Sequence, residues 1–252
     1  GQYAGERQRN LYNPTMVMEY MDLSDLLEYL KRKGSGETLA MDVSTVEVAL
    51  VLAHALADLH RNGFIHRDVK SQNIFLSTTH YIRLGDVGSA RTVDELMTAD
   101  IGTLFWMAPE VLRVGYEGKD QPYTIAADIY SFGVVLTELD TLKVPYEDEV
   151  HRYAIPNKVR NGQLRPHMSD SCPQWLRDLA DQCLSLDPKD RPTAENIIAT
   201  LLPHHDTTRF DLFDVEDDVD DVEEPSDARS PNNDEEEVET SMLCDAFLAL
   251  HL

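Results

Sequence analysis

Apolar residues recur every three or four positions along several stretches of the chain, which is the spacing of one face of an α-helix. In one stretch, 43–60, Ser44 stands near the start as a candidate N-cap, a residue whose side chain accepts a hydrogen bond from a free backbone N–H. We therefore predict a buried helix there. Similar patterns predict further helices over 24–33, opened by Ser24, and over 126–140, 174–186 and 194–202.

Short apolar runs between polar turns are typical of β-strands. Residues 15–21 form a run of strand length, and the runs 74–76 and 81–84 flank a polar turn, which predicts a hairpin. Because helical patterns dominate, we predict an α+β fold that is mostly helical. The expected parts are a small β remnant with a connector over 1–21, a helical lobe over 22–205 and a tail over 206–252.

The composition of the tail differs from that of the rest of the chain. The formal net charge is −24, and residues 211–240 hold fifteen Asp or Glu against one Arg, a charge of −14. Such a segment buries too little apolar area to order itself, so we expect 206–240 to be disordered. An acidic chain repels phosphate backbones and anionic lipids, so we expect no nucleic acid and no anionic membrane as partner.

The cysteines and the hydropathy bear on the cellular compartment. Cys172, Cys183 and Cys244 lie far apart in sequence and form neither a paired disulfide framework nor a metal-ligand cluster. No apolar stretch is long enough to predict a membrane span, and no basic-then-apolar leader indicates secretion. We therefore expect a cytoplasmic, reducing environment.

Four polar residues follow one another in an order that suits phosphoryl transfer. Asp68, Lys70 and Asn73 fall close together, and Asp86 comes shortly afterwards. A hydroxyl that attacks a nucleotide γ-phosphate needs a carboxylate to orient it, a cation near the transferred group and oxygen ligands for Mg²⁺. These four side chains supply that set.

Three further motifs accompany this set: Asp86-Val87-Gly88, Ala108-Pro109-Glu110 and Asp128-Ile129-Tyr130-Ser131-Phe132-Gly133. In this order they resemble the eukaryotic protein kinase catalytic domain, over roughly residues 10–203. Lys70 at its spacing from Asp68 is typical of Ser/Thr-specific kinases. The form Trp106-Met107-Ala108-Pro109-Glu110 resembles the tyrosine-kinase-like branch that includes Raf and mixed-lineage kinases. The resemblance implies a protein-kinase-like fold that uses ATP and Mg²⁺ and acts on a protein with a Ser or Thr acceptor.

The resemblance also implies a role for each polar residue of the site. Asp68 would be the catalytic base, and Lys70 would neutralise charge on the γ-phosphate. Thr103 would bridge these two side chains through its hydroxyl. Asn73 and Asp86 would bind Mg²⁺ through hard oxygen atoms.

A second group would bind the nucleotide. Met18 falls at the gatekeeper position, so Glu19 and Met21 would offer backbone groups to the adenine edge. Asp25 would reach the ribose, and Phe75 would form the floor under the adenine ring. Ordinary apolar packing is the alternative interpretation for Met18 and Met21.

Other residues match structural positions of the family. Glu110 and Arg191 would form a buried ion pair, and Asp128 would hold the backbone of the catalytic loop. Arg67 would clamp a phosphate on the activation segment, for which Thr92 and Thr98 are the candidate acceptors.

The chain departs from the family pattern before Met18. Only seventeen residues precede it, and they contain no glycine-rich loop and no lysine, so we expect weak ATP binding and poor turnover from the chain as printed. Val87 also replaces the usual Phe. A Ser/Thr kinase is the leading hypothesis, and a pseudokinase or scaffold that binds a regulatory protein partner is the alternative.

Overall fold

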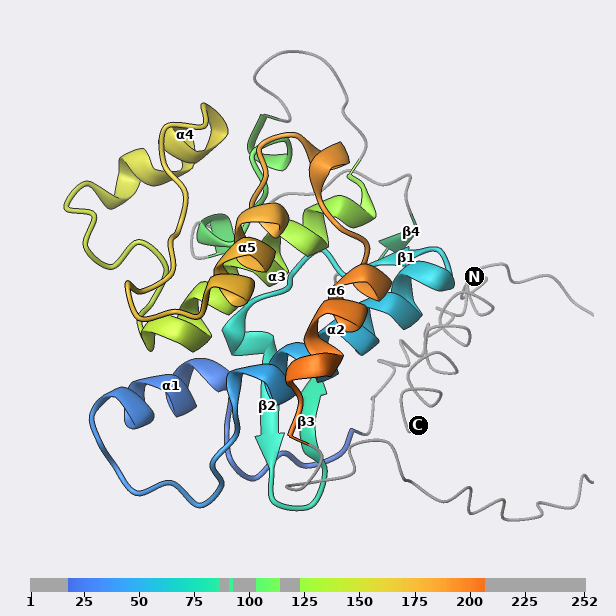
Figure 1. The fold of residues 1–252 in the computed structure, drawn as a ribbon, viewed down its shortest axis with the longest axis vertical. Helices are drawn as coiled ribbons and strands as arrows, with labels where there is room; N and C mark the ends of the chain where they lie inside the picture. The colour runs from blue at the N-terminus through green and yellow to red at the C-terminus, as the bar shows by residue number, and fades with distance from the viewer. Residues whose placement is uncertain (1–17, 87–90, 93–102, 114–122, 207–252) are drawn as a thin grey trace, which may run out of the picture.

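The computed structural model describes residues 18–86, 91–92, 103–113 and 123–206 (Figure 1). Their α-helices are α1 (Leu26–Gly34), α2 (Thr45–Arg61), α3 (Ile125–Thr141), α4 (Ile155–Arg160), α5 (Gln174–Cys183) and α6 (Ala194–Leu201). Their strands are β1 (Phe64–Ile65), β2 (Ile74–Ser77), β3 (Tyr81–Leu84) and β4 (Arg91–Thr92). Single 3₁₀ turns occur at η1 (Ser71–Asn73), η3 (Thr103–Phe105), η4 (Val111–Arg113), η5 (Arg152–Ala154), η6 (Pro188–Asp190) and η7 (Leu202–His204).

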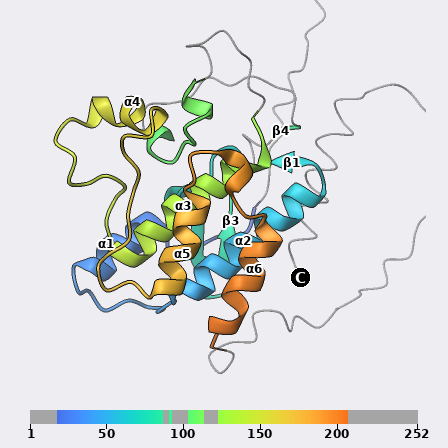
Figure 2. The same ribbon diagram turned by 45° about the horizontal axis from the view of Figure 1, so that its top comes forward.

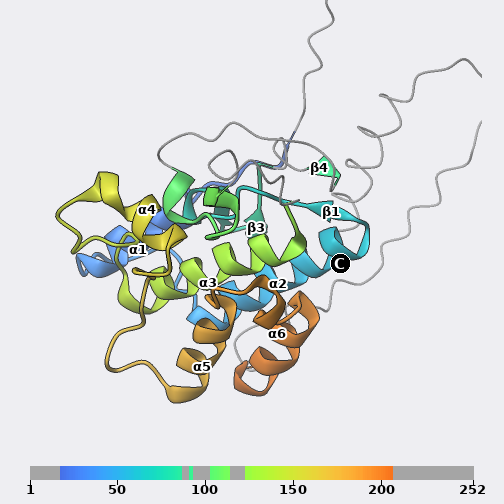
Figure 3. The ribbon, with the colours of Figure 1, turned by 90° about the horizontal axis from the view of Figure 1, so that it is seen from above.

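Helix α3 is the centre of the core. Thirteen of its seventeen residues are buried, and α2 and α5 both pack against it (Figure 2). A Cβ atom at Gly133 would lie 2.8 Å from Cβ of Cys183, so glycine allows the close approach of α3 and α5. Figure 3 shows α5 and α6 on one side of α2 and α3, with β1 and β3 on the other. The site is built on this second side.

The predicted helix over 43–60 is confirmed as α2. The Ser44 hydroxyl accepts a hydrogen bond from Glu47 N at 3.1 Å, and the Glu47 carboxylate accepts one from Ser44 N at 2.5 Å. This reciprocal pair satisfies two backbone donors at the helix start. The helix then runs directly into β1 and the loop that follows it.

The predicted hairpin is also confirmed. Strands β2 and β3 pair antiparallel, with Ile74 opposite Leu84 and Ser77 opposite Tyr81. The connector joins the outer edge of β2, because Leu23 N donates to Leu76 O and Leu76 N donates to Ser24 O, both at 3.0 Å. The hairpin therefore has a defined position relative to the connector.

Three predictions of element boundaries were wrong. Residues 18–21, the described part of the predicted strand over 15–21, form no strand, because no described strand pairs with them. Asp25, not Ser24, caps α1, since Ser24 has φ 70° and lies one residue before the cap. Helix α5 ends at Cys183 rather than 186, with Leu184 as its C-cap, whose backbone N–H donates to Ala180 O.

Among the described residues, none of the helices combines the length and the hydropathy that crossing a membrane requires. The helices predicted over 126–140 and 194–202 are confirmed as α3 and α6. The predicted disordered segment over 206–240 and the apolar end at 242–252 lie outside the described residues, apart from residue 206. The described part is mostly helical with two small two-stranded sheets, in agreement with the predicted α+β class.

Candidate active site

The loop over 66–73 is held from below by Asp128 on α3. Its Oδ2 accepts a hydrogen bond from His66 N at 2.8 Å, and its Oδ1 accepts one from Arg67 N at 2.9 Å. His60 Nε2 on α2 lies 2.9 Å from the same carboxylate, which is fully buried. Arg67 has φ 68°, a left-handed conformation that costs a non-glycine residue about 1–2 kcal/mol. The bonds to Asp128 hold the loop in this conformation, which confirms the predicted role of Asp128.

The buried ring of His66 joins the two acid-bearing turns. Asp68 N donates to Nδ1 at 3.4 Å, so Nε2 carries the proton and donates to Gly85 O at 3.1 Å. Burial lowers the pKa of His66, which favours this neutral form. Gly85 N also donates to Asn73 O at 2.8 Å. The turn that carries Asp86 is therefore attached to the loop that carries Asp68 and Asn73.

The two oxygen atoms of Asp68 have different surroundings. Oδ2 accepts hydrogen bonds from Lys70 Nζ at 2.6 Å and from Asn73 Nδ2 at 2.9 Å. Oδ1 is buried and has no hydrogen-bond partner within the part of the chain that the structure describes. A buried acceptor without a partner costs free energy, which a donor arriving at this oxygen would recover. The carboxylate is therefore oriented through Oδ2, whereas Oδ1 has no donor among the described residues.

Asn73 and Asp86 have the donor chemistry of a Mg²⁺ site. The amide nitrogen of Asn73 donates to Asp68 O at 2.8 Å as well as to Oδ2, so the amide oxygen of Asn73 is the atom left to a ligand. Asp86 is exposed and has φ 59°. The described residues contain no group of three His, Cys, Asp or Glu that could hold a metal ion. Mg²⁺ at nucleotide sites needs only one or two protein oxygens besides phosphate and water, so these two residues fit it.

The connector carries the residues predicted to bind the nucleotide. Met18 is 58% exposed, whereas Met21 is half-buried. The Glu19 carboxylate lies 3.5 Å from Arg83 Nε and 3.6 Å from His80 Nδ1, so its side chain is directed at β3. The role predicted for the Glu19 backbone stays a prediction.

Asp25 and Phe75 meet where the connector ends. They form an isolated antiparallel bridge, and Asp25 Oδ1 accepts a hydrogen bond from Glu28 N at 2.9 Å as the N-cap of α1. A Cβ atom at Gly85 would lie 2.7 Å from the ring of Phe75, so this ring lies directly against the turn that leads to Asp86. The structure thus brings the predicted adenine floor next to the predicted metal ligand.

The segment over 103–110 carries two more of the residues singled out in the sequence, Thr103 and Glu110. Its 3₁₀ turn η3 begins at Thr103, whose side chain lies outside the described part, as do Val87 and Thr98. Further on, Arg191 donates from Nη1 and Nη2 to the two carboxylate oxygens of Glu110 at 2.7 and 2.8 Å. This bidentate pair confirms the predicted link between Glu110 and Arg191.

Two polar side chains of α3, those of Glu138 and Ser131, bond to segments beside the site and were given no role in the sequence analysis. Glu138 is fully buried on α3 and accepts hydrogen bonds from Ser71 Oγ and Trp106 Nε1, both at 2.8 Å. Ser131 Oγ donates to Trp106 O at 2.8 Å. The available signal was a single acid, Glu138, in the apolar run of 129–139, which shows only that such an acid must find partners.

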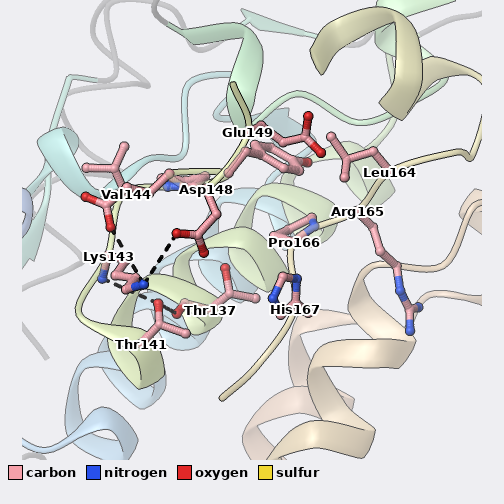
Figure 4. Close-up of a pocket in the computed structure, with 13 residues that line it drawn as sticks. Thr137, Thr141, Lys143, Val144, Asp148, Glu149, Leu164, Arg165, Pro166 and His167 are labelled. Atoms are coloured by element: carbon pink, nitrogen blue, oxygen red, sulfur yellow. Dashed lines mark hydrogen bonds and ion pairs between the residues drawn. The ribbon is translucent and has the colours of Figure 1, made fainter. Parts of the chain in front are cut away.

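A separate cavity of about 140 Å³ lies at the end of α3 (Figure 4). It is lined by Thr137 and Thr141 of the helix and by the loops over 143–149 and 164–167. Lys143 Nζ lies 3.6 Å from Asp148 Oδ1 at its edge. None of the predicted site residues lines this cavity.

Comparison with known proteins identifies the family. A model of the protein kinase domain matches residues 3–202. A Dictyostelium discoideum protein that carries the name probable serine/threonine-protein kinase is 35% identical over 191 residues, 75% of this chain and 11% of the relative. An Arabidopsis thaliana protein, serine/threonine/tyrosine-protein kinase HT1, is 34% identical over 189 residues, 74% of this chain and 46% of the relative. The chain thus spans less than half the length of either relative. These matches confirm the resemblance: the chain belongs to the protein kinase domain family.

Proposed function

We propose that this chain transfers the γ-phosphate of ATP to Ser or Thr hydroxyls of a protein substrate. The observation that carries the proposal is the carboxylate of Asp68. Its Oδ2 is held by Lys70 and Asn73, and its buried Oδ1 has no partner among the described residues. A base that orients a nucleophile needs this combination of a fixed position and an acceptor oxygen that is not already bonded to a donor.

In the proposed reaction the substrate hydroxyl donates a hydrogen bond to Asp68 Oδ1. The hydroxyl oxygen forms a bond to the γ-phosphorus while the bond from phosphorus to the bridging oxygen of ADP breaks. The electron pair of that bond leaves with ADP, and the hydroxyl proton passes to Asp68. Lys70 Nζ, 2.6 Å from Asp68 Oδ2, lies close enough to offset negative charge on the transferred group, with the Thr103 hydroxyl as the proposed bridge.

Nucleotide and metal are assigned to the residues around this base. Asn73 and Asp86 would hold Mg²⁺, which supplies positive charge to the phosphates when it is bound. The adenine would lie on Phe75, with its edge at the backbone of Glu19 and Met21 behind Met18, and the ribose near Asp25. Two observations support the proposed specificity for Ser and Thr: the presence of Lys70, and the names of the two relatives. The name of the Arabidopsis relative also includes tyrosine.

The test is a phosphate-transfer assay with Mg²⁺ and ATP on the full-length protein that its gene encodes. We expect Asp68→Asn to lower kcat by about 10²- to 10⁴-fold, the usual contribution of a general base. Asp170→Asn is the matched control, since Asp170 is an exposed acid remote in sequence from the catalytic loop. Equal activity of the Asp68 variant and wild type would contradict the proposal.

A folded wild-type protein that transfers no phosphate, even with its activating phosphate supplied, would favour the pseudokinase or scaffold alternative. Binding of Mg²⁺·ATP separates the two steps. We expect Asp86→Asn to weaken this binding in the presence of Mg²⁺ and to have no effect on binding of ATP alone. Equal loss under both conditions would remove Asp86 from the metal site.

A further inference from the structure

Glu138 connects two segments that are far apart in the sequence. It lies near the end of α3, and its side chain is fully buried. Oε1 accepts a hydrogen bond from Ser71 Oγ and Oε2 accepts one from Trp106 Nε1, each at 2.8 Å. One carboxyl group therefore links α3 to the catalytic loop and to the segment that follows η3.

One linked residue is adjacent to a predicted catalytic residue, and the other follows three positions after one. Ser71 directly follows Lys70, which contacts Asp68 at 2.6 Å. Trp106 directly follows η3 (Thr103–Phe105). Trp106 is bound to α3 a second time, because Ser131 Oγ donates to its backbone oxygen at 2.8 Å. A shift of Glu138 would thus reach both segments.

The electrostatic environment of Glu138 shows that hydrogen bonding, not ion pairing, holds it. Among the described residues, no Lys, Arg or His forms an ion pair with it. Burial raises its pKa to about 8, and only the bonds from Trp106 and Ser71 oppose this rise. A protonated carboxyl group still serves both partners, because its C=O accepts from the indole N–H while a hydroxyl partner can donate or accept.

We propose that Glu138 is a positioning residue for phosphoryl transfer, which holds the catalytic loop and the Thr103–Trp106 segment at a fixed separation. This inference rests on the proposed function. Since the side chain is fully buried and both oxygens are used within the fold, Glu138 does not contact the protein substrate. Its effect on the reaction passes through Ser71 and Trp106, whose displacement would misalign the base Asp68 and the Thr103–Trp106 segment.

Two substitutions of Glu138 separate the effect of its hydrogen bonds from the effect of its side-chain volume. In Glu138→Gln the amide oxygen accepts from Trp106 Nε1 and the amide nitrogen donates to Ser71 Oγ, so both links persist. In Glu138→Leu the volume is similar, but both links are lost. We expect Glu138→Gln to keep kcat within about threefold of wild type and Glu138→Leu to lower kcat about 10- to 100-fold. The KM for ATP should rise less than kcat falls, because the connector residues proposed to bind the nucleotide base lie outside the two segments that Glu138 links.

Thr137→Val is the matched control for the loss of a buried polar group. Thr137 is the neighbour of Glu138 on α3 and is 3% exposed, but its hydroxyl donates within the helix, to Val134 O at 2.7 Å. We expect this variant to lose stability without a change in kcat. If Glu138→Leu does not fold, Ser71→Ala and Trp106→Phe remove one link each, and we expect each to lower kcat whereas Thr137→Val does not; unchanged kcat in both single-link variants would overturn the positioning role.

Hydrogen exchange provides a readout that needs no activity. Amides of 66–73 and 103–106 should exchange faster in Glu138→Leu than in Thr137→Val or Glu138→Gln. If the wild-type protein transfers no phosphate but the amides still exchange faster in Glu138→Leu, the structural link through Glu138 is supported and only the proposed function is contradicted. Unchanged exchange and kcat in folded Glu138→Leu, or a Gln variant as slow as the Leu variant, would overturn the positioning role.

Discussion

The catalytic loop and the connector are held in the fold in opposite ways. The loop over 66–73 is attached to α3 through the buried carboxyl groups of Asp128 and Glu138. The connector over 18–25 is attached through backbone bonds to β2, while Met18 and Tyr20 remain 58% and 81% exposed. The difference indicates that the groups expected to act on the phosphate are preorganised by the core, whereas those expected to contact the nucleotide base depend little on it.

The largest effect should follow from removal of the anchor beneath the loop. Asp128→Ala would leave the N–H groups of His66 and Arg67 buried without acceptors. Each such loss costs about 1–3 kcal/mol, so we expect the free energy of unfolding to fall by about 2–6 kcal/mol. Urea unfolding measures this change. A loss below 1 kcal/mol would mean that water or a local rearrangement satisfies these groups, and the contrast with the connector would weaken.

The pH dependence of stability tests the second anchor. Because the pKa of Glu138 is about 8 in the fold and near 4.5 when unfolded, the folded protein holds one more proton between these values. Its contribution to stability is therefore full below about pH 4.5 and is lost as the pH rises to about 8, by at most about 1.4 kcal/mol per pH unit.

Glu138→Gln removes this contribution to the slope, so urea unfolding of wild type and variant between pH 5 and 8 should give curves that converge or cross rather than run parallel. The comparison is needed because burial lowers the pKa of His54 and His66, which adds stability as the pH rises. Parallel curves would show that Glu138 titrates at its ordinary value.

Disruption of the contact between the hairpin and the Asp86 turn should lower stability by an intermediate amount. In Gly85→Ala the new Cβ would lie 2.7 Å from the Phe75 ring, which cannot move without leaving its place beside the turn. We expect a loss of about 1–3 kcal/mol and weaker ATP binding. Adding Phe75→Leu should recover part of the stability. If the double variant is no more stable than Gly85→Ala, the loss does not come from a clash with the Phe75 ring.

The smallest effect is expected in the connector. Met18→Ala should change the free energy of unfolding by less than about 0.5 kcal/mol, because the side chain is mostly exposed. If Met18 is the gatekeeper, the same variant should still alter binding of nucleotide analogues enlarged on the base. A large loss of stability would instead support the packing interpretation of this residue.

Local pattern was sufficient for the elements that it specifies directly. The spacing of apolar residues and the capping box of Ser44 predicted α2, and the two apolar runs predicted the β2–β3 hairpin. The connector was predicted wrongly over 18–21, since an apolar run becomes a strand only when another strand pairs with it. Pairing is a tertiary property, and so a run of suitable residues does not determine it.

The sequence by itself determined the order of the chemical groups: Asp68, Lys70, Asn73 and Asp86, the pair Glu110 and Arg191, and the family to which they point. Only the tertiary structure decided that Lys70 and Asn73 both bind Oδ2 of Asp68, whereas its Oδ1 has no partner among the described residues, and that Glu138 joins Ser71 to Trp106. The physical reason is that a buried polar group must find partners, but sequence spacing does not say which distant segments supply them.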